Sequence, residues 1–397
     1  MQDLTYDMLR AACTAGGGSV LTSRTELVPA AGPVAGIAPP RFVDGNNPVY
    51  AYETRFDGEQ PVTTVVLLSK GAALNKVEAG LIAAIRDGHP LLTRMPHLVL
   101  RYEGKDPVTE LEVPHRAYDG HFRAGTIDGK PATDHPAYRA LRDATPGNAR
   151  ALLETSPVSA ALGCWDSTRK SNQARYRSLL VGEIIGVLAD QSTPPITPRR
   201  GAARTDDISP SVRVSGDDME QILLAQAGEL SPGNIEKIRS DIRKAKKGTV
   251  SAAGLGLGSI PPSMAGLGLV SCRRIIRHHV LSFAALRQLR FGLGAEGDVS
   301  GRALLAALAL NGLARADAEL ELRANCDLTE AAPSVVELDA RYGRRTALNR
   351  LEIDPADALL EEALARATGA GVRWEGQRLE VIGDPKIAGG MSDESEE

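Results

Sequence analysis

Several residue types are scarce in this chain of 397 residues, and each scarcity narrows the possible function. Aromatic residues make up only 4% of the sequence, which argues against a single-strand binding protein built on stacked rings. The four cysteines are scattered with no C-x-x-C spacing, so we predict neither a zinc site nor a disulfide framework. We expect these cysteines to be buried as small hydrophobic residues: Cys13, Cys164, Cys272 and Cys326.

Long apolar runs are also missing. No run approaches the roughly 18 apolar residues that a membrane helix needs, so we expect no membrane partner. The first residues, MQDLTYDMLRAAC, have an acid at position three and lack the apolar core of a signal peptide, so we expect a cytoplasmic protein. An apolar fraction of 43% is typical of a globular protein, and the length suits two or three structural units or one core with large insertions.

Catalytic motifs are absent as well. The sequence contains no G-x-S-x-G, Walker lysine loop or H-E-x-x-H. The segment HRAYDGHF, which begins at His115, lacks the asparagine and the upstream motifs of a kinase catalytic loop. His278 and His279 are neighbours on opposite faces of a predicted strand and cannot chelate one metal ion together. We therefore expect a protein that is not an enzyme and that needs no cofactor or metal.

Charge is distributed unevenly along the chain, although the net charge is only -4. From Trp165 to Arg290 there are 19 Lys/Arg and 11 Asp/Glu, whereas the remainder has 27 Lys/Arg and 39 Asp/Glu. A basic segment between acidic flanks indicates an electrostatic footprint for a polyanion. The alternative is a chance clustering of cations on solvated helices.

The basic segment begins with WDSTRKSNQARYR, residues 165–177, which holds two rings, Trp165 and Tyr176, and one acid, Asp166. Its cations and its amide donor are Arg169, Lys170, Asn172, Arg175 and Arg177. Apolar spacing predicts a helix over 172–190, which would place these cations near a helix start, where exposed amides also favour anions. The alternative is that Trp165 anchors the core and Asp166 caps the helix.

Further cations occur along the same basic segment. The PRRGAAR turn contains Arg199 and Arg200, and NIEKIRSDIRKAKKG, residues 234–248, predicts a basic helix or a disordered stretch. The glycine-rich residues 249–271 follow no strand and precede no helix, so they do not form a dinucleotide fingerprint. An extended loop flanked by cations suits a backbone that lies against nucleic acid. The lysines at the end of the basic stretch are Lys244, Lys246 and Lys247.

Periodicity predicts a mixed fold of class α+β. Strands are expected over 19–28, 62–69, 97–103, 109–114, 270–282, 318–324, 335–339 and 377–383, and helices over 75–88, 283–292, 301–316 and 354–369. The strand over 270–282 places Arg273 and Arg277 on one face. Ser282 is the expected cap of the helix that follows, in which Arg287 and Arg290 share a face.

Four stretches carry a resemblance to a known family. They are LGCWDSTRKSNQARYRSLLVGEIIGV, VVLLSKGAALNKVEAGLI, PHRAYDG and GSIPPSMAGLGLVSCRRIIRHHVLSFAALRQLRFG. Over residues 22–291 the chain resembles the Cas-seven-type backbone subunit of the type I-U (also called I-G) CRISPR interference complex. This resemblance implies an RNA-recognition-motif-like (ferredoxin-like) antiparallel sheet with large insertions. It also implies several copies that polymerise along a guide RNA and present it to target DNA.

The same resemblance implies partners and site residues. The partners are other copies of the chain, a guide-processing subunit, a large subunit and a helicase-nuclease. The matching positions are Trp165, Asp166, Ser167, Thr168, Arg169, Asn172 and Arg175 in the first block, Asn75, Lys76 and Glu78 in the second, and Leu281, Ser282, Leu286 and Arg287 in the third. Position 76 is lysine where the pattern leads us to expect arginine, which preserves a phosphate contact but not a bidentate one.

Residues and resemblance together predict an RNA-binding set and a domain plan. The set comprises Asn75, Lys76, Arg169, Lys170, Asn172, Arg175, Arg177, Arg199, Arg200, Lys244, Lys246, Lys247, Arg273, Arg277 and Arg287. The plan has a core over 1–291, with insertions at about 31–48, 115–150 and 191–268, an extension over 292–383 packed on the core, and a disordered acidic tail over 384–397.

Two other functions compete with this prediction. An RNA-processing endonuclease of related fold would need an acid or base near a ribose hydroxyl, for which His115, His278 or His279 could serve. A purely structural oligomer would bind no nucleic acid.

Overall fold

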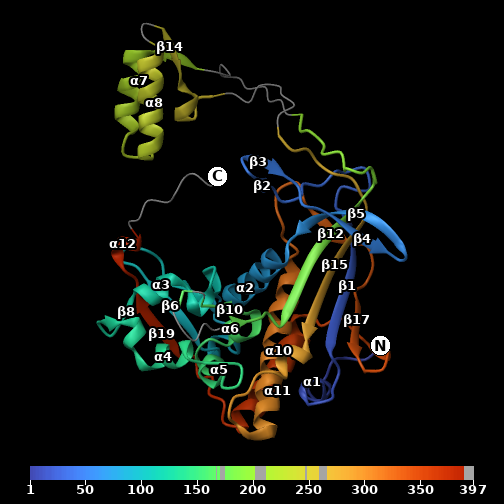
Figure 1. Cartoon of the computed structure of the whole chain (residues 1–397). Helices are drawn as coiled ribbons and strands as arrows, with labels where there is room; N and C mark the ends of the chain where they lie inside the picture. Colours follow the sequence, from blue (N-terminus) through green and yellow to red (C-terminus); the bar gives the residue numbers. More distant parts are fainter. Residues whose placement is uncertain (167, 170–174, 202–211, 246–247, 259–265, 389–397) are drawn as a thin grey trace. The chain divides into compact units, whose positions relative to one another are not determined.

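The structure is a computed structural model that describes residues 1–166, 168–169, 175–201, 212–245, 248–258 and 266–388 (Figure 1). The chain forms two compact units. Unit 1 comprises residues 1–40, 51–191 and 271–397, and unit 2 comprises residues 41–50 and 192–270. The segment expected as an insertion at about 191–268 falls almost wholly in unit 2, whereas the other two expected insertions contribute residues to unit 1.

An antiparallel sheet of eight strands forms the centre of unit 1, in the order β18-β17-β1-β15-β12-β5-β4, with β16 paired to β1. The strands are β1 (Val20–Pro29), β4 (Tyr52–Asp57), β5 (Gln60–Leu68), β12 (Leu180–Leu188), β15 (Cys272–Ser282), β16 (Leu328–Glu330), β17 (Val335–Asp339) and β18 (Arg345–Leu348). Together with its helices this sheet confirms the α+β class. The finer expectation of an RNA-recognition-motif-like core stays a prediction.

The helix predicted over 172–190 is wrong, because residues 180–188 form strand β12 in the middle of the sheet. Nearly every residue of β12 is buried, so its two faces show no polar alternation and its apolar spacing resembles that of a helix. Gly182 is needed in this strand, since a Cβ there would collide with the ring of His279 on the neighbouring strand β15. The periodicity therefore led to a wrong prediction, because β12 is buried on both faces.

One face of the sheet is covered by helices, of which α10 is the most buried. The helices are α1 (Tyr6–Cys13), α2 (Lys70–Arg86), α9 (Phe283–Leu286), α10 (Gly294–Glu319) and α11 (Ile353–Gly369). Figure 1 shows α10 and α11 running together beside the strands. The strand expected over 318–324 is wrong: α10 continues to Glu319 and ends at Leu320, whose φ is 42°. Among the described residues, no helix has the length and apolar character to cross a membrane.

Residues 292–383, expected as an extension packed on the core, belong to unit 1 and contribute buried residues to its core. Helix α10 contributes a long run of buried residues, and β16, β17 and β18 complete the main sheet. A second sheet, in the order β7-β6-β19-β8-β9, joins distant parts of the chain. Its strands are β6 (His97–Arg101), β7 (Val108–Thr109), β8 (Thr126–Ile127), β9 (Lys130–Pro131) and β19 (Arg378–Ile382), and β19 pairs with β6 in parallel.

The stretch expected as an insertion at 115–150 is also part of the core. It folds into α3 (Gly120–Ala124), α4 (Pro136–Arg142) and short turns, and it buries large side chains. These side chains are Tyr118, Phe122, Tyr138 and Leu141. Their spacing is irregular because the helices are only one or two turns long, and so the sequence shows little periodicity.

Unit 2 contains a small module with its own core. Strands β13 (Arg213–Ser215) and β14 (Thr249–Ser251) pair with each other, and helices α7 (Gly216–Gln226) and α8 (Pro232–Ala245) pack together. The core residues are Met219, Leu223, Ile238, Val250 and Ala252. Unit 2 also contains the hairpin of β2 (Phe42–Asp44) and β3 (Asn47–Val49). Of the two alternatives for the basic stretch, the helix is found.

Candidate nucleic-acid interface

A short hairpin carries the described part of the WDSTRKSNQARYR block. Strands β10 (Cys164–Trp165) and β11 (Arg175–Tyr176) pair so that Cys164 lies opposite Tyr176 and Trp165 lies opposite Arg175. Cys164 and Tyr176 are buried, whereas 46% of Trp165 is exposed and Arg175 is exposed beside it. The alternation of a strand therefore presents the indole and the guanidinium together on the surface. Trp165 is not the core anchor of the alternative interpretation.

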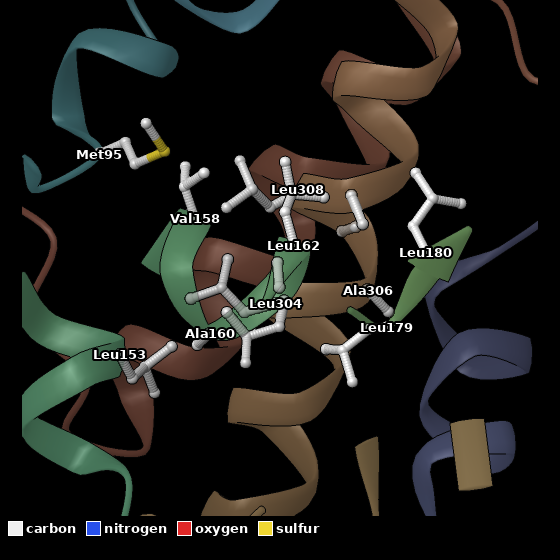
Figure 2. Packing of buried hydrophobic residues seen from close by; sticks show 14 of the residues in the cluster. Met95, Leu153, Val158, Ala160, Leu162, Leu179, Leu180, Leu304, Ala306 and Leu308 are labelled. Carbon is white, nitrogen blue, oxygen red and sulfur yellow. The ribbon is translucent and has the colours of Figure 1, made fainter. Parts of the chain in front are cut away.

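Both ends of this hairpin are fixed by the core of unit 1. Helix α6 (Pro157–Leu162) leads into it, and Leu179 follows it. Figure 2 shows the packed side chains, which include Val158, Ala160 and Leu162 of α6, Leu304, Ala306 and Leu308 of α10, and Leu179 and Leu180 after the hairpin. The backbone N–H of Leu179 donates to Ala161 O at 2.9 Å. The hairpin thus projects from a rigid base.

Gly163 forms the hinge between α6 and the hairpin. Its φ is 87°, in the left-handed region that favours glycine. A Cβ at this position would lie 2.7 Å from the backbone nitrogen of Ser178 and 2.8 Å from the carbonyl oxygen of Tyr176. The Arg116 guanidinium donates to Gly163 O at 2.8 Å and forms an ion pair with the buried Glu78 at 2.5 Å. Glu78, on α2, therefore holds the Arg116 side chain in place against the carbonyl oxygen of Gly163.

The guanidinium of Arg175 stacks on the indole of Trp165, with its central carbon 4.4 Å from the ring centroid. Cation–π pairs of this kind hold both groups in a defined geometry at a surface. The planar pair offers a π face to a nucleobase and a positive charge to a phosphate. This is the chemistry that a single-stranded nucleic acid requires.

Asp166 is buried directly behind this pair and organises two arginines. Arg142 donates to Asp166 Oδ2 from Nη2 at 2.7 Å, and Arg123 Nη1 lies 3.5 Å from Oδ1. Two guanidinium groups share one carboxylate, so the cluster keeps a positive charge. Asp166 does not cap a helix, since no helix follows it in the described residues around the hairpin.

Arg169 belongs to the same cluster. Its Nη1 donates to the carbonyl oxygen of Arg142 at 2.7 Å, and its Nη2 pairs with Asp143 Oδ1 at 2.7 Å. Arg123 and Arg142 are the site residues that sequence reasoning missed. They lie in the stretch expected as an insertion, and no local pattern there pointed to Asp166.

A cleft of about 790 Å³ opens beside the hairpin. Its walls include His115, His121, Arg123, Trp165 and Thr168. The ring of His121 lies 2.7 Å from a carboxylate oxygen of Asp119. Burial opposes ionisation of Asp119, but hydrogen bonds from the backbone and ring of His121 and from the backbone of His115 outweigh it and lower the pKa of this carboxyl.

The other predicted RNA-binding residues are distributed over several elements. Asn75 is exposed on α2, and the neighbouring Lys76 pairs with Glu321. Arg177 is exposed after β11, and Arg273 is exposed near the start of β15. The predicted residues that lie in the described part of unit 2 are all exposed: Arg199, Arg200 and Lys244. Lys170, Asn172, Lys246 and Lys247, together with Ser167 of the first block, lie outside the described residues.

Two of the predicted RNA-binding residues make their contacts inside unit 1. Arg277 is only 3% exposed and forms ion pairs with Asp317 at 3.2 Å and Glu330 at 2.5 Å, because its face of β15 packs against α10. Arg287 is partly buried, and its Nη1 donates to the carbonyl oxygens of Ala12 and Gly18 at 2.6 and 2.8 Å. Both guanidinium groups are engaged in contacts that hold parts of unit 1 together.

The adjacent histidines occupy opposite faces of β15, as the strand pattern predicts. His279 is buried, and burial, followed by the charges of Arg277 and His278, lowers its pKa to about 3. His278 Nε2 lies 3.0 Å from a carboxylate oxygen of Glu183, which Arg55 also contacts at 2.6 Å. The hydrogen bond from His278, assisted by Arg55, lowers the pKa of Glu183 strongly. In the described part of the chain, no three His, Cys, Asp or Glu side chains gather as a metal site would require.

Comparison with known proteins gives one informative match. No curated protein matches the chain. Residues 21–191, less than half of the chain, match the model of a family described as CRISPR-associated protein GSU0053 (Cas_GSU0053). This region contains α2, the hinge, the hairpin and all of the residues that line the cleft except Ile387. The match supports a CRISPR-associated protein with a role in CRISPR defence.

Proposed function

We propose that this chain is a cytoplasmic backbone subunit of a CRISPR interference complex that binds the guide RNA. The observation that carries the proposal is the hairpin with Trp165 and Arg175 on its outer face. Three arginines, Arg123, Arg142 and Arg169, lie beside or behind it. A single strand of RNA provides both partners that this surface lacks, an unstacked base for the ring pair and phosphates for the excess charge.

A guide-binding subunit must leave the base edges free for pairing with target DNA. Cations that contact phosphates satisfy this condition because they bind without reading sequence. A single exposed ring pair fits the same requirement, since stacking tolerates any base. The matched region supports the CRISPR context, and the charged hairpin supports RNA as the ligand within it.

Polymerisation along the guide follows from the same proposal. Each copy binds a short stretch of RNA, and successive copies form a helical filament that presents the guide to target DNA. The further partners proposed are a guide-processing subunit, a large subunit and a helicase-nuclease. The exposed cations of unit 2, Arg199, Arg200 and Lys244, are candidates for additional contacts with the same strand.

One observation favours a second candidate, an RNA-processing endonuclease. The cleft brings the exposed His115 and the pair of His121 with Asp119 to the side of the hairpin. A histidine held by a carboxylate can act as a general base toward a ribose hydroxyl. We favour binding without cleavage, since the stacked Trp165 and Arg175 beside this cleft form an exposed surface suited to binding.

The deciding experiment expresses the chain with and without a CRISPR guide. After purification, nucleic acid is extracted, and particle mass is measured by light scattering. The proposal predicts bound guide RNA and particles several times the mass of one chain only when the guide is present. Protein that purifies free of RNA, with the same mass in both cases, would contradict it. Incubation with repeat RNA and magnesium tests the second candidate, which requires cleavage that His121→Ala removes.

A further inference from the structure

We propose that the tip of the β17–β18 hairpin, residues 340–344, is a separate contact for single-stranded nucleic acid, in which Tyr342 stacks on a base and Arg344 contacts a phosphate. The tip lies outside residues 21–191, so the family match says nothing about it. The proposal goes beyond the guide-binding function, because it concerns a second surface of unit 1 and does not require the Trp165 hairpin to bind.

Tyr342 is the most exposed large aromatic side chain among the described residues, with 94% of its surface accessible. Its φ is 55°, a left-handed conformation that is unfavourable for a bulky residue. Asparagine or glycine would form the same turn with less strain. Strained residues persist where the surrounding structure holds them in place, and such positions cluster at functional sites. The turn therefore holds an aromatic ring in solvent at the expense of stability.

The base of the tip is pinned to the beginning of β1. The two oxygens of Asp339 accept hydrogen bonds from the backbone nitrogens of Ser19 at 2.6 Å and Arg341 at 2.9 Å. The Arg341 side chain donates to Ser19 Oγ at 2.6 Å. Gly18 permits this approach, because a Cβ there would collide with the carbonyl oxygen of Asp339. These contacts fix the backbone of the turn that carries the ring, which reduces the entropy lost on binding.

Positive charge surrounds the ring. Arg341, Arg344 and Arg345 are all exposed within three positions of Tyr342. Within the part of the chain that the structure describes, Arg345 alone of these three forms an ion pair, with Glu337 at 2.6 Å. The Arg341 guanidinium donates to the Ser19 hydroxyl, and its charge also acts on the nearby Asp339 carboxylate, so Arg344 is the cation that we assign to the phosphate. An aromatic ring between guanidinium groups is the combination that binds unstacked bases and phosphates.

The chemistry selects a single strand as the ligand. A duplex hides its base faces in stacking, so Tyr342 would find no partner there, and an acidic protein surface would engage the arginines but not the ring. Guide RNA and a DNA strand offer the same base and phosphate chemistry. Separate RNA and DNA oligonucleotides distinguish these two sources.

The test compares three variants of the full chain by fluorescence anisotropy with labelled single-stranded RNA and DNA of mixed sequence. Arg175→Gln is present throughout, so that binding by the Trp165 hairpin is already weakened. Tyr342→Asn keeps the left-handed turn but removes the ring, and it should weaken binding about 5- to 100-fold. Tyr342→Trp should preserve binding. Arg344→Gln should lower the slope of log affinity against log salt by about 0.7.

A direct readout comes from Tyr342→Trp in a Trp165→Phe background, where the remaining native tryptophan, Trp374, is buried. Stacking on a base should quench the emission of the new indole. Unchanged affinity in Tyr342→Asn together with unquenched emission would overturn the proposal. Polyglutamate carries negative charge but no bases. If it displaces the oligonucleotide equally well from Tyr342→Asn and from the parent that keeps Tyr342, charge alone explains binding, and the proposal is overturned. The two proposals can fail separately. If Trp165→Ala abolishes guide binding while Tyr342→Asn still lowers the affinity for the oligonucleotide, the contact at Tyr342 is distinct from the guide-binding site at Trp165.

Discussion

Arg142 donates two hydrogen bonds to one oxygen of Asp166, from Nε at 3.1 Å and from Nη2 at 2.7 Å. The carboxylate is buried, and the Arg142 side chain is nearly so. The pair joins α4 to the base of the hairpin, and it fixes the arginine cluster behind Trp165. The stability of unit 1 and the geometry of the candidate interface therefore depend on the same contact.

We predict that Asp166→Asn lowers the free energy of unfolding by about 2 to 4 kcal/mol, because it leaves buried guanidinium charge without a carboxylate. Urea unfolding followed by circular dichroism measures the change. Asp143→Asn is the matched control, since Asp143 is half exposed and its pair with Arg169 should contribute less than about 1 kcal/mol. Equal effects of the two substitutions would show that the buried position of Asp166 is unimportant.

A pH dependence is expected from Glu110. Burial raises its pKa to about 8, although Ser156 Oγ and the backbone nitrogen of Leu98 donate to its oxygens at 2.7 and 2.8 Å. The folded state therefore holds a proton that the unfolded state releases near pH 4.5. The stability contributed by this proton is present at low pH and is lost as pH rises toward 8, by at most about 1.4 kcal/mol per pH unit.

Glu110→Gln should flatten the stability profile between pH 5 and pH 8, as measured by urea unfolding at several pH values. Burial also raises the pKa of Glu78 and Asp317, so a weaker slope of the same sign should remain. Glu380→Gln is the control, because Glu380 is exposed and its pKa is lowered by the hydrogen bond from Arg101. A profile that Glu110→Gln leaves unchanged would contradict the prediction.

Trp165→Ala and Arg175→Gln should each weaken binding of single-stranded RNA. Loss of the indole removes stacking worth about 1 to 3 kcal/mol per base, and loss of the cation should reduce the salt slope by about 0.7. Filter binding from low to moderate salt measures both. Arg366→Gln provides the comparison, because Arg366 lies over the ring of Tyr6 in an equivalent cation–π pair elsewhere in unit 1. Identical losses in all three variants would indicate a non-specific charge effect.

Gly163→Ala should destabilise the chain more than Gly104→Ala. Both glycines have positive φ, which costs alanine about 1 kcal/mol. Only at Gly163 would the added Cβ also meet backbone atoms, whereas nothing lies within 4 Å of the Cβ position at Gly104. Thermal unfolding of the two variants gives the difference. A smaller shift for Gly163→Ala would mean that the hinge can relax.

Substitution of Lys244, Lys246 and Lys247 together by glutamine should weaken RNA-dependent assembly and leave the melting temperature unchanged. Exposed lysines contribute within about 0.5 kcal/mol to stability, and Lys244 is exposed at the end of α8. Light scattering with and without guide RNA measures assembly. If the triple variant assembles at the same RNA concentration as the original chain, these lysines play no part in the filament.

Local signals in the sequence predicted much of the fold. The apolar run of β5 followed by the helical spacing of α2 was recognised, and so was Ser282, whose hydroxyl accepts from Ala285 N at the start of α9. Strand β12 was not recognised, because a strand buried on both faces has no alternation to detect. All four cysteines were expected inside, and Cys13, Cys164 and Cys326 are buried while Cys272 is partly buried.

The candidate site was predicted only in part, because its partners are distant in sequence. Trp165 and Arg175 were recognised as neighbours of a cationic block, but Arg123 and Arg142 reach Asp166 across more than twenty residues. Arg277 was expected at the surface, since no local pattern reveals that Asp317 and Glu330 neutralise it inside. Ion pairs between remote segments leave no trace in the spacing of residues.

The parallel pairing of β6 with β19 sets the order in which the chain can acquire its structure. The two strands lie far apart in the sequence, since β6 spans residues 97–101 and its partner spans residues 378–382. Until residues 378–382 are present, the second sheet cannot close, and β6 has one edge unpaired. Such long-range pairing makes folding slow and exposes aggregation-prone edges. Removal of residues 378–382 should therefore leave β6 with an unpaired edge and promote aggregation of the chain.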